Sequence, residues 1–294
     1  MLYFLILCLT FFTVYIDASA ERGRVVLITG ASRGLGMATA KCLADNDYRV
    51  YAGVRDLSAF SDQKNLSFVK LDVTDIATIR LTVNQIIAKE GRLDVLINNA
   101  AYAVAGPLES LTMEEMQRQV DVNFFGPIQV CQEVLPQMRK QKSGHIINIS
   151  SEQGIYGCCY GSLYSASKAA LESVSEALSI ELMPWNIHVS IVEPGLITTK
   201  FTIQMGSKVI DGNPYKKIVD TIEKSLNERI AHPELLTPSQ SASEVAEFIL
   251  DVIEDPTPKL RYQTSEACKE IVSMKLTDLS GEKYLAKMLG LESK

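Results

Sequence analysis

A glycine-rich turn between a buried strand and a helix constrains the fold of this chain more than any other sequence feature. The apolar run Val25–Ile28 is short and continuous, which is typical of a strand buried on both faces. It is followed by Thr29–Gly36 (TGASRGLG) and by an amphipathic helical pattern that continues through Leu43. Glycines permit a tight turn and allow the backbone to approach a pyrophosphate at a helix N-terminus. The pattern therefore predicts the first β-α unit of a dinucleotide-binding sheet.

Strand-like and helix-like segments alternate along most of the chain. We predict strands over Val25–Ile28, Arg49–Gly53, Ser67–Leu71, Leu93–Ile97, His145–Ile149 and Ile187–Val192. Helices are predicted over Ile76–Lys89, Met113–Lys140, Tyr164–Met183 and Ser241–Ile253, and a short strand over Leu260–Gln263 is followed by amphipathic helix to the end. This alternation predicts an α/β fold of the Rossmann type, in which helices cover both faces of a doubly wound parallel sheet. Such sheets bind ligands at the carboxyl ends of their strands.

The regular pattern weakens after Pro194-Gly195. Residues 198–240 contain glycines and the prolines Pro214, Pro233 and Pro238, so we predict a mobile substrate flap with short helices after the sixth strand. We expect residues 21–294 to form a single domain that includes this flap.

Charge and side-chain chemistry exclude several classes of function. The 294 residues include 35 acidic and 29 basic ones, and a formal net charge of −6 argues against a protein that binds nucleic acid by neutralising phosphates. The three histidines lie far apart without carboxylates at ligand spacing, so no metal site is predicted. The six cysteines show neither CxxC nor framework spacing, and we interpret them as reduced, mostly buried residues.

The first twenty residues differ from the rest and account for the positive mean hydropathy of +0.08. The uncharged apolar run Leu2–Ile16 is shorter than the roughly 20 residues that span a bilayer, and it precedes the small-x-small sequence Ala18–Ala20, which favours a cleaved signal peptide. However, no Lys or Arg precedes the run, whereas Arg22 and Arg24 follow it, which favours a signal anchor with the following residues in the cytosol. A buried N-terminal strand or helix is the third alternative.

A tyrosine and a lysine stand four residues apart in the predicted helix Tyr164–Met183. Residues at this spacing lie on one helix face, so we expect the Lys168 ammonium to lower the pKa of the Tyr164 phenol toward neutral pH, as a general acid or base requires. Taken alone, the pair would also fit a solvated helix face.

The residues after the second predicted strand bear on the choice of dinucleotide. An NAD-binding chain places a carboxylate near the ribose 2′-hydroxyl, but Val54 occupies that position here. Arg55 follows, and Arg33 in the glycine turn adds a second guanidinium that can bind a 2′-phosphate. The sequence therefore favours NADP(H) over NAD(H). Asp56 leaves NAD open, since a shift of one residue would bring its carboxylate near the ribose.

These motifs together resemble the short-chain dehydrogenase/reductase family, in the form with a TGxxxGxG turn and a YxxxK pair. The resemblance is close over residues 24–200 and looser beyond them. Asn98–Ala101 stand where the family has NNAG, with Ala101 in place of the glycine, and Thr199 completes a PGxxxT motif. The resemblance implies a nicotinamide cofactor bound by Gly30, Ser32, Arg33, Gly34, Leu35, Gly36, Arg55, Asp72, Val73, Asn99, Ala100, Tyr164, Lys168, Pro194, Gly195 and Thr199.

The resemblance also implies a catalytic tetrad. The family places its serine thirteen residues before the tyrosine, which selects Ser151, whereas Ser150 would face the other side of its strand. Tyr164 would exchange a proton with the substrate oxygen that Ser151 polarises. Lys168 would hold the nicotinamide ribose, and Asn123 would anchor a chain of water molecules.

Several stretches are most similar to the branch of 17β-hydroxysteroid and retinol dehydrogenases: Val50–Asp56, Leu135–Arg139 and Val192–Gly195. The expected pocket wall is Gly154–Gly161 with Phe201, Ile203 and Met205, which is mostly apolar. The resemblance thus implies an oxidoreductase for a hydrophobic alcohol or ketone, such as a steroid or retinoid. The alternatives are a reductase of acyl chains on a carrier protein and a non-catalytic NADP-binding sensor or scaffold.

The resemblance further implies a homodimer or homotetramer. Because the NADP pool that such an enzyme needs is cytosolic, we expect membrane association through residues 2–16 with the catalytic domain facing the cytosol. Cleavage after Ala20 and entry into the secretory route remain the alternative.

Overall fold

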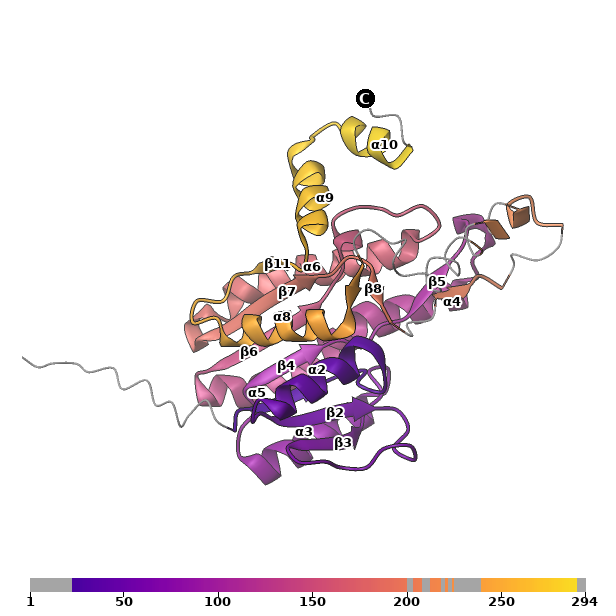
Figure 1. Ribbon diagram of the computed structural model, residues 1–294. Helices are drawn as coiled ribbons and strands as arrows, with labels where there is room; N and C mark the ends of the chain where they lie inside the picture. The colour runs from indigo at the N-terminus through magenta and orange to yellow at the C-terminus, as the bar shows by residue number, and fades with distance from the viewer. Residues whose placement is uncertain are drawn as a thin grey trace, which may run out of the picture.

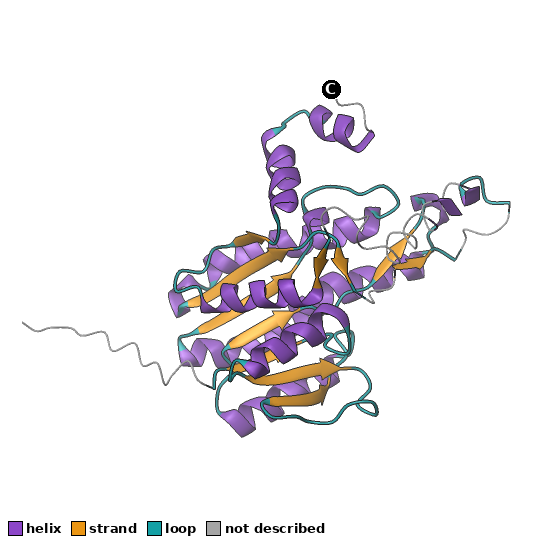
Figure 2. Cartoon of the chain, viewed as in Figure 1, coloured by secondary structure: helices purple, strands orange, loops and turns teal. Residues whose placement is uncertain are grey.

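The fold is centred on one parallel sheet of seven strands (Figures 1 and 2), in the order β11-β7-β6-β4-β1-β2-β3. The computed structural model describes residues 23–199, 203–207, 212–217, 220–221, 224 and 239–289. The predicted doubly wound α/β sheet is confirmed, and the strands differ from the predicted ranges by only a few residues. They are β1 (Val25–Ile28), β2 (Arg49–Val54), β3 (Leu66–Lys70), β4 (Val95–Asn98), β6 (Gly144–Ile149), β7 (Ile187–Glu193) and β11 (Arg261–Gln263).

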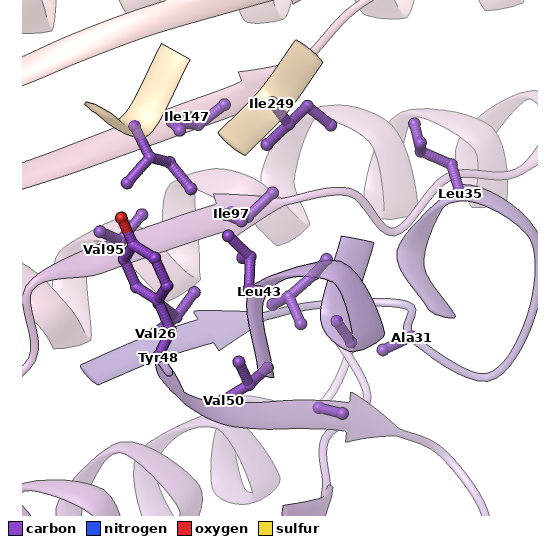
Figure 3. Close-up of a cluster of buried hydrophobic side chains, with 14 of the residues drawn as sticks. Val26, Ala31, Leu35, Leu43, Tyr48, Val50, Val95, Ile97, Ile147 and Ile249 are labelled. Atoms are coloured by element: carbon purple, nitrogen blue, oxygen red, sulfur yellow. The ribbon is translucent and has the colours of Figure 1, made fainter. Parts of the chain in front are cut away.

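Helices cover both faces of the sheet, so each strand must present apolar side chains to both sides. Side chains alternate between the two faces of a strand. In β1, Val26 and Ile28 therefore pack toward α2 (Gly34–Asp45) and α8 (Ala242–Glu254), where Figure 3 shows Val26 with Leu43 and Ile249. Val25 and Leu27 face the other layer. That layer consists of α3 (Ile76–Glu90), α5 (Gly126–Gln141) and α6 (Ser162–Glu181).

The predicted helical stretch Met113–Lys140 is helical throughout, but it contains a π turn that the sequence did not predict. The segment consists of α4 (Met113–Val120), a π-helical turn over Asp121–Phe125, and α5. Pro127 has no N–H to donate to the carbonyl of Asn123 four residues earlier, so the regular hydrogen-bond pattern fails here. Asn123 lies in the middle of this π turn.

Two small parallel pairs lie beyond the carboxyl ends of the main strands. β8 (Ile197–Thr198) pairs with β10 (Gln240–Ser241), and β5 (Ala103–Ala105) pairs with β9 (Ile203–Met205). The sequence predicted neither pair. Most of the predicted flap at 198–240 lies outside the described residues, so its extent and mobility stay a prediction.

The C-terminal tail also differs from the prediction of amphipathic helix to the end. It consists of two helices, α9 (Glu266–Thr277) and α10 (Glu282–Leu289). Gly281 separates them with a φ of +76°, which favours glycine, and the Asp278 carboxylate accepts the backbone N–H of Lys283 at 2.8 Å.

Residues 1–22, with the predicted leader, lie outside the described residues. Among the helices that are described, none combines the length and the apolar character needed to cross a membrane.

Candidate active site

A cleft of about 1330 Å³ opens where the strands of the main sheet end. Its walls come from the loops after β1, β2, β3, β4, β6 and β7, as expected for an open parallel sheet. The structure brings every residue predicted for cofactor binding to this cleft, and three members of the predicted tetrad with them. These residues are Gly30, Ser32, Arg33, Gly34, Leu35, Gly36, Arg55, Asp72, Val73, Asn99, Ala100, Ser151, Tyr164, Lys168, Pro194, Gly195 and Thr199.

The glycine turn packs so closely on the end of β4 that side chains would not fit. A Cβ at Gly36 would lie 2.4 Å from the Asn99 amide nitrogen, and one at Gly30 would lie 2.7 Å from the Cα of Ala100. The Asn99 amide in turn donates to the carbonyl of Thr29 at 2.9 Å and fixes the turn. The side chain of the N-cap residue Arg33 makes no hydrogen bond to the start of α2, so it does not occupy the first backbone N–H groups of this helix. This arrangement fits a dinucleotide pyrophosphate.

The structure clarifies the carboxylate at the end of β2. The strand continues through Val54, and both Val54 and Arg55 line the cleft, as does Arg33. Asp56 is not among the cleft residues. Its carboxylate accepts the backbone N–H of Ser58 at 2.9 Å, and this bond holds the carboxyl pKa below its usual range. Asp56 therefore stabilises a local turn, and Arg33 and Arg55 both bring guanidinium groups to the cleft.

Ser151, Tyr164 and Lys168 converge from two elements. Ser151 follows β6, and Tyr164 and Lys168 lie one turn apart on α6. The Ser151 hydroxyl lies beside the Tyr164 phenol, accepts the backbone N–H of Gln153 at 3.2 Å and donates to the carbonyl of Pro194 at 3.4 Å. The Lys168 ammonium donates to the carbonyl of Ile149 at 2.7 Å and lies 5.8 Å from the centre of the Tyr164 ring. The tyrosine and the lysine thus share one helix face, as predicted.

The expected lowering of the Tyr164 pKa by Lys168 is wrong for this structure. Burial raises the pKa of the phenol to about 12, although the hydrogen bond from Ser151 opposes the rise. The ring is partly exposed to the cleft, but its surroundings disfavour a phenolate. Burial also lowers the pKa of the Lys168 ammonium to about 8, against the opposing effect of the Glu172 carboxylate. Desolvation is the largest cause of both pKa shifts.

Asn123 lies behind the cleft and does not line it. Its side chain is fully buried and connects two neighbouring segments. The Asn123 amide oxygen accepts the backbone N–H of Tyr102 at 2.8 Å, and the amide nitrogen donates to the Ser167 hydroxyl at 3.0 Å. This side chain holds the loop after β4 against α6. Its predicted role in a water chain stays a prediction.

A buried ionic cluster lies under the active-site end of α6. Ser150 also lines the cleft, and its hydroxyl donates to the Glu172 carboxylate at 2.6 Å. Arg261 of β11 contacts both Glu172 and Glu193 at 2.6 Å. Burial raises the pKa of the Glu172 carboxyl despite these bonds. Sequence reasoning missed this cluster because its members come from distant segments.

The predicted pocket wall Gly154–Gly161 is only half correct. Its second half lines the cleft together with Ile203 and Met205, whereas residues 154–157 do not. Tyr156 instead packs on Tyr284 of α10, with ring centres 5.4 Å apart, because this loop lies under the C-terminal tail. Phe201 lies outside the described residues.

Polar residues that the sequence did not reveal also line the cleft. The Arg118 guanidinium lies 4.8 Å from the centre of the Tyr102 ring, and the Tyr102 hydroxyl donates to Gln204 at 2.8 Å. The strongly amphipathic pattern of α4 was the available signal, since it presents one polar face. These polar lining residues include Tyr102, Glu114, Gln117, Arg118, Asp121 and Gln204.

Among the described residues, no group of three His, Cys, Asp or Glu side chains could hold a metal ion. All five described cysteines are free, but only Cys131 and Cys268 are buried, fewer than predicted.

Comparison with known proteins agrees with this geometry. The family model described as short chain dehydrogenase matches residues 24–209. A curated 3-ketodihydrosphingosine reductase from Bacteroides thetaiotaomicron is 46% identical over 182 residues, which cover 61% of this chain and 66% of that protein. Retinol dehydrogenase 8 from Bos taurus is 33% identical over 280 residues, covering 90% of this chain and 89% of the relative. Human 17-beta-hydroxysteroid dehydrogenase type 1 is also 33% identical, with 90% and 84% covered.

Solved structures share the fold. A short-chain dehydrogenase from Streptomyces avermitilis has a TM-score of 0.72 at 29% identity, covering 91% of this chain and 98% of the other. ElxO with NADP bound has a TM-score of 0.67 at 28% identity, covering 82% and 98%.

Proposed function

Because this chain belongs to the short-chain dehydrogenase family, as the match over residues 24–209 shows, we propose that it is an NADP(H)-dependent oxidoreductase for a hydrophobic substrate. It would interconvert a hydroxyl and a carbonyl on a steroid, a retinoid or a similar lipid-like molecule. The observation that carries the proposal is the convergence of Ser151, Tyr164 and Lys168 beside the tight glycine turn in one cleft.

The roles of the side chains follow from their positions. When bound, the nicotinamide supplies or accepts the hydride at the substrate carbon. In reduction, Tyr164 donates its proton to the carbonyl oxygen, and the Ser151 hydroxyl hydrogen-bonds the same oxygen. Lys168 would hold the nicotinamide ribose with its ammonium.

NADP(H) is favoured by the two cleft guanidinium groups and by the local turn that engages Asp56. We expect an Arg33→Ala/Arg55→Ala double variant to raise the KM for NADPH by about 100-fold, since a hydrogen bond to a charged group contributes about 1.5–3 kcal/mol. The KM for NADH should stay within about threefold, because NADH lacks the 2′-phosphate that these side chains would bind.

Initial-rate measurements with both cofactors check this expectation. Arg80→Ala is the matched control, because that arginine lies on α3 and pairs with Glu133. Equal losses for NADPH and NADH would contradict a role of the two arginines in cofactor choice.

The substrate class is supported by the apolar part of the cleft and by the relatives. Ile203 and Met205 line it, and the relatives include proteins named for retinol, for a 17-beta-hydroxysteroid and for a ketosphingoid base. We expect the full chain in mild detergent to consume NADPH with an apolar ketone or aldehyde from a steroid, retinoid or sphingoid panel. Cofactor absorbance measures the reaction.

Two other functions would give different results in that panel. Activity confined to β-ketoacyl groups on a carrier protein would favour an acyl-carrier reductase. Tight NADPH binding without turnover of any carbonyl would favour a sensor or scaffold.

We also propose membrane association through residues 2–16 with the catalytic domain in the cytosol, and a homodimer or homotetramer. The apolar run and the downstream Arg22 and Arg24 support the first. Secretion after cleavage at Ala20 is the alternative.

A further inference from the structure

The amino edge of the sheet, opposite the cleft, brings the start of the described chain close to a loop near the middle of the sequence. Val26 pairs with Val95, Val95 with His145, and His145 with His188, so these residues form one row across β1, β4, β6 and β7. The described chain begins three residues before Val26, and a loop at Trp185 lies three residues before His188. Three strand spacings of about 4.8 Å separate β1 from β7, a distance of about 14 Å.

Apolar side chains of this loop and of the adjoining end of α6 are exposed, and no other described element covers them with an apolar layer. Ile180 at the end of α6 is 71% exposed, and Met183 is 70% exposed. Trp185 ends the 3₁₀ turn Met183–Trp185 and is 36% exposed. Three large apolar residues within six positions differ from the scattered exposed residues of an ordinary surface.

One basic side chain contacts the exposed tryptophan, and two more basic residues follow the first one in the sequence. The Arg139 guanidinium lies 5.7 Å from the centre of the Trp185 ring, and Lys140 and Lys142 follow it at the end of α5. All three are exposed, and Glu181 is the acidic residue in the same stretch of α6. A tryptophan among lysines and arginines is the combination that favours the headgroup region of a bilayer with anionic lipids.

We propose that this amino-edge face, defined as Arg139, Lys140, Ile180, Met183 and Trp185, lies on an anionic lipid bilayer. The leader sequence supports this occupant. The described chain begins at this edge with Gly23, and six residues connect Gly23 to the apolar run Leu2–Ile16 in the sequence, a reach of about 20 Å at most. A leader held in a bilayer would therefore keep Trp185 within reach of the headgroups. The inference concerns this surface and does not depend on the enzymatic activity.

The sequence allows a direct test, because Trp185 is the single tryptophan of the chain. Its fluorescence is measured for the full chain bound to phosphatidylcholine vesicles that contain about one fifth phosphatidylserine. We expect a blue shift of the emission and at least a twofold loss of intensity when the lipids carry a spin label at the headgroup. The proposal would be overturned if the chain sediments with the vesicles but headgroup labels leave its emission unchanged. In that case the leader alone would bind the chain to the vesicles.

A second copy of the chain is the competing occupant of this face. It would shift the emission as the protein concentration rises, without quenching by labelled lipid, and this outcome would also overturn the proposal.

Charge-reversal variants separate the face from the leader. Arg139→Glu/Lys140→Glu should lower the lipid quenching of Trp185 severalfold, while the leader still binds the vesicles. The matched control is Lys70→Glu/Lys269→Glu, which reverses two exposed lysines at the carboxyl end of β3 and on α9. Equal quenching in the two double variants would contradict a contribution of the basic residues. Unchanged thermal unfolding midpoints confirm that both variants are folded.

Discussion

A Tyr164→Phe variant is expected to lose about three orders of magnitude in kcat, because general acid catalysis by a positioned side chain contributes 10²–10⁴-fold. The substitution removes the hydroxyl that bonds Ser151 and retains the ring that packs in the cleft. The affinity for NADPH should stay within about threefold, since the glycine turn and the arginines are unchanged. Rates of NADPH oxidation and cofactor fluorescence titration measure the two quantities separately.

Tyr102→Phe is the matched control for this variant. Tyr102 also lines the cleft, and its hydroxyl bonds Gln204 at 2.8 Å, away from Ser151. We expect its kcat to stay within about fivefold of the parent chain, because an exposed neutral hydrogen bond contributes only about 1 kcal/mol. Unchanged turnover in Tyr164→Phe would disprove the proposed mechanism.

An Arg261→Met variant is expected to lose about 3–5 kcal/mol of folding free energy, because removing one partner of a buried ion pair leaves a buried charge without compensation. Two carboxylates would lose their partner, since Glu193 is fully buried and Glu172 is 3% exposed. The Glu172 pKa is already raised by burial, so we expect this carboxyl to take up a proton in the variant. Thermal unfolding should show a midpoint lower by about 10 °C.

Glu176→Gln tests whether burial causes the loss. Glu176 also contacts Arg261, but its side chain is half exposed, so this variant should cost less than about 1 kcal/mol. Glu172→Gln/Arg261→Met should recover part of the lost stability, because Glu172→Gln removes a carboxylate that Arg261→Met leaves without its cationic partner. Similar midpoints for Arg261→Met and Glu176→Gln would show that the buried pairs contribute little.

The sequence predicted the sheet well because local chemistry determines it. A strand covered by helices on both faces must be apolar throughout. All four residues of Val25–Ile28 are apolar and buried, as a central strand of this sheet requires. The π turn after Val120 was not predicted, because hydrophobic periodicity barely changes across a single π turn. Pro127 was the visible signal, since its missing N–H disturbs the carbonyl of Asn123.

Site residues were predictable where a strand end places them, as for Ser151 and the glycine turn. Contacts between distant segments were not, and Arg261 lies 89 residues from Glu172 in the chain. The pKa of Tyr164 was predicted with the wrong sign because sequence spacing gives the charge of a neighbour but not the extent of desolvation.

The common direction of all main-sheet strands also affects how this chain would receive its substrate. The amino-edge face and the cleft lie at opposite ends of strands of about six residues, so about 20 Å of protein separates them. With the amino-edge face on a bilayer, the mouth of the cleft would face the water layer above the headgroups. A lipophilic substrate could then not diffuse sideways from the acyl chains into the cleft. Its rate of desorption from the membrane, or its delivery by a soluble carrier, would limit turnover.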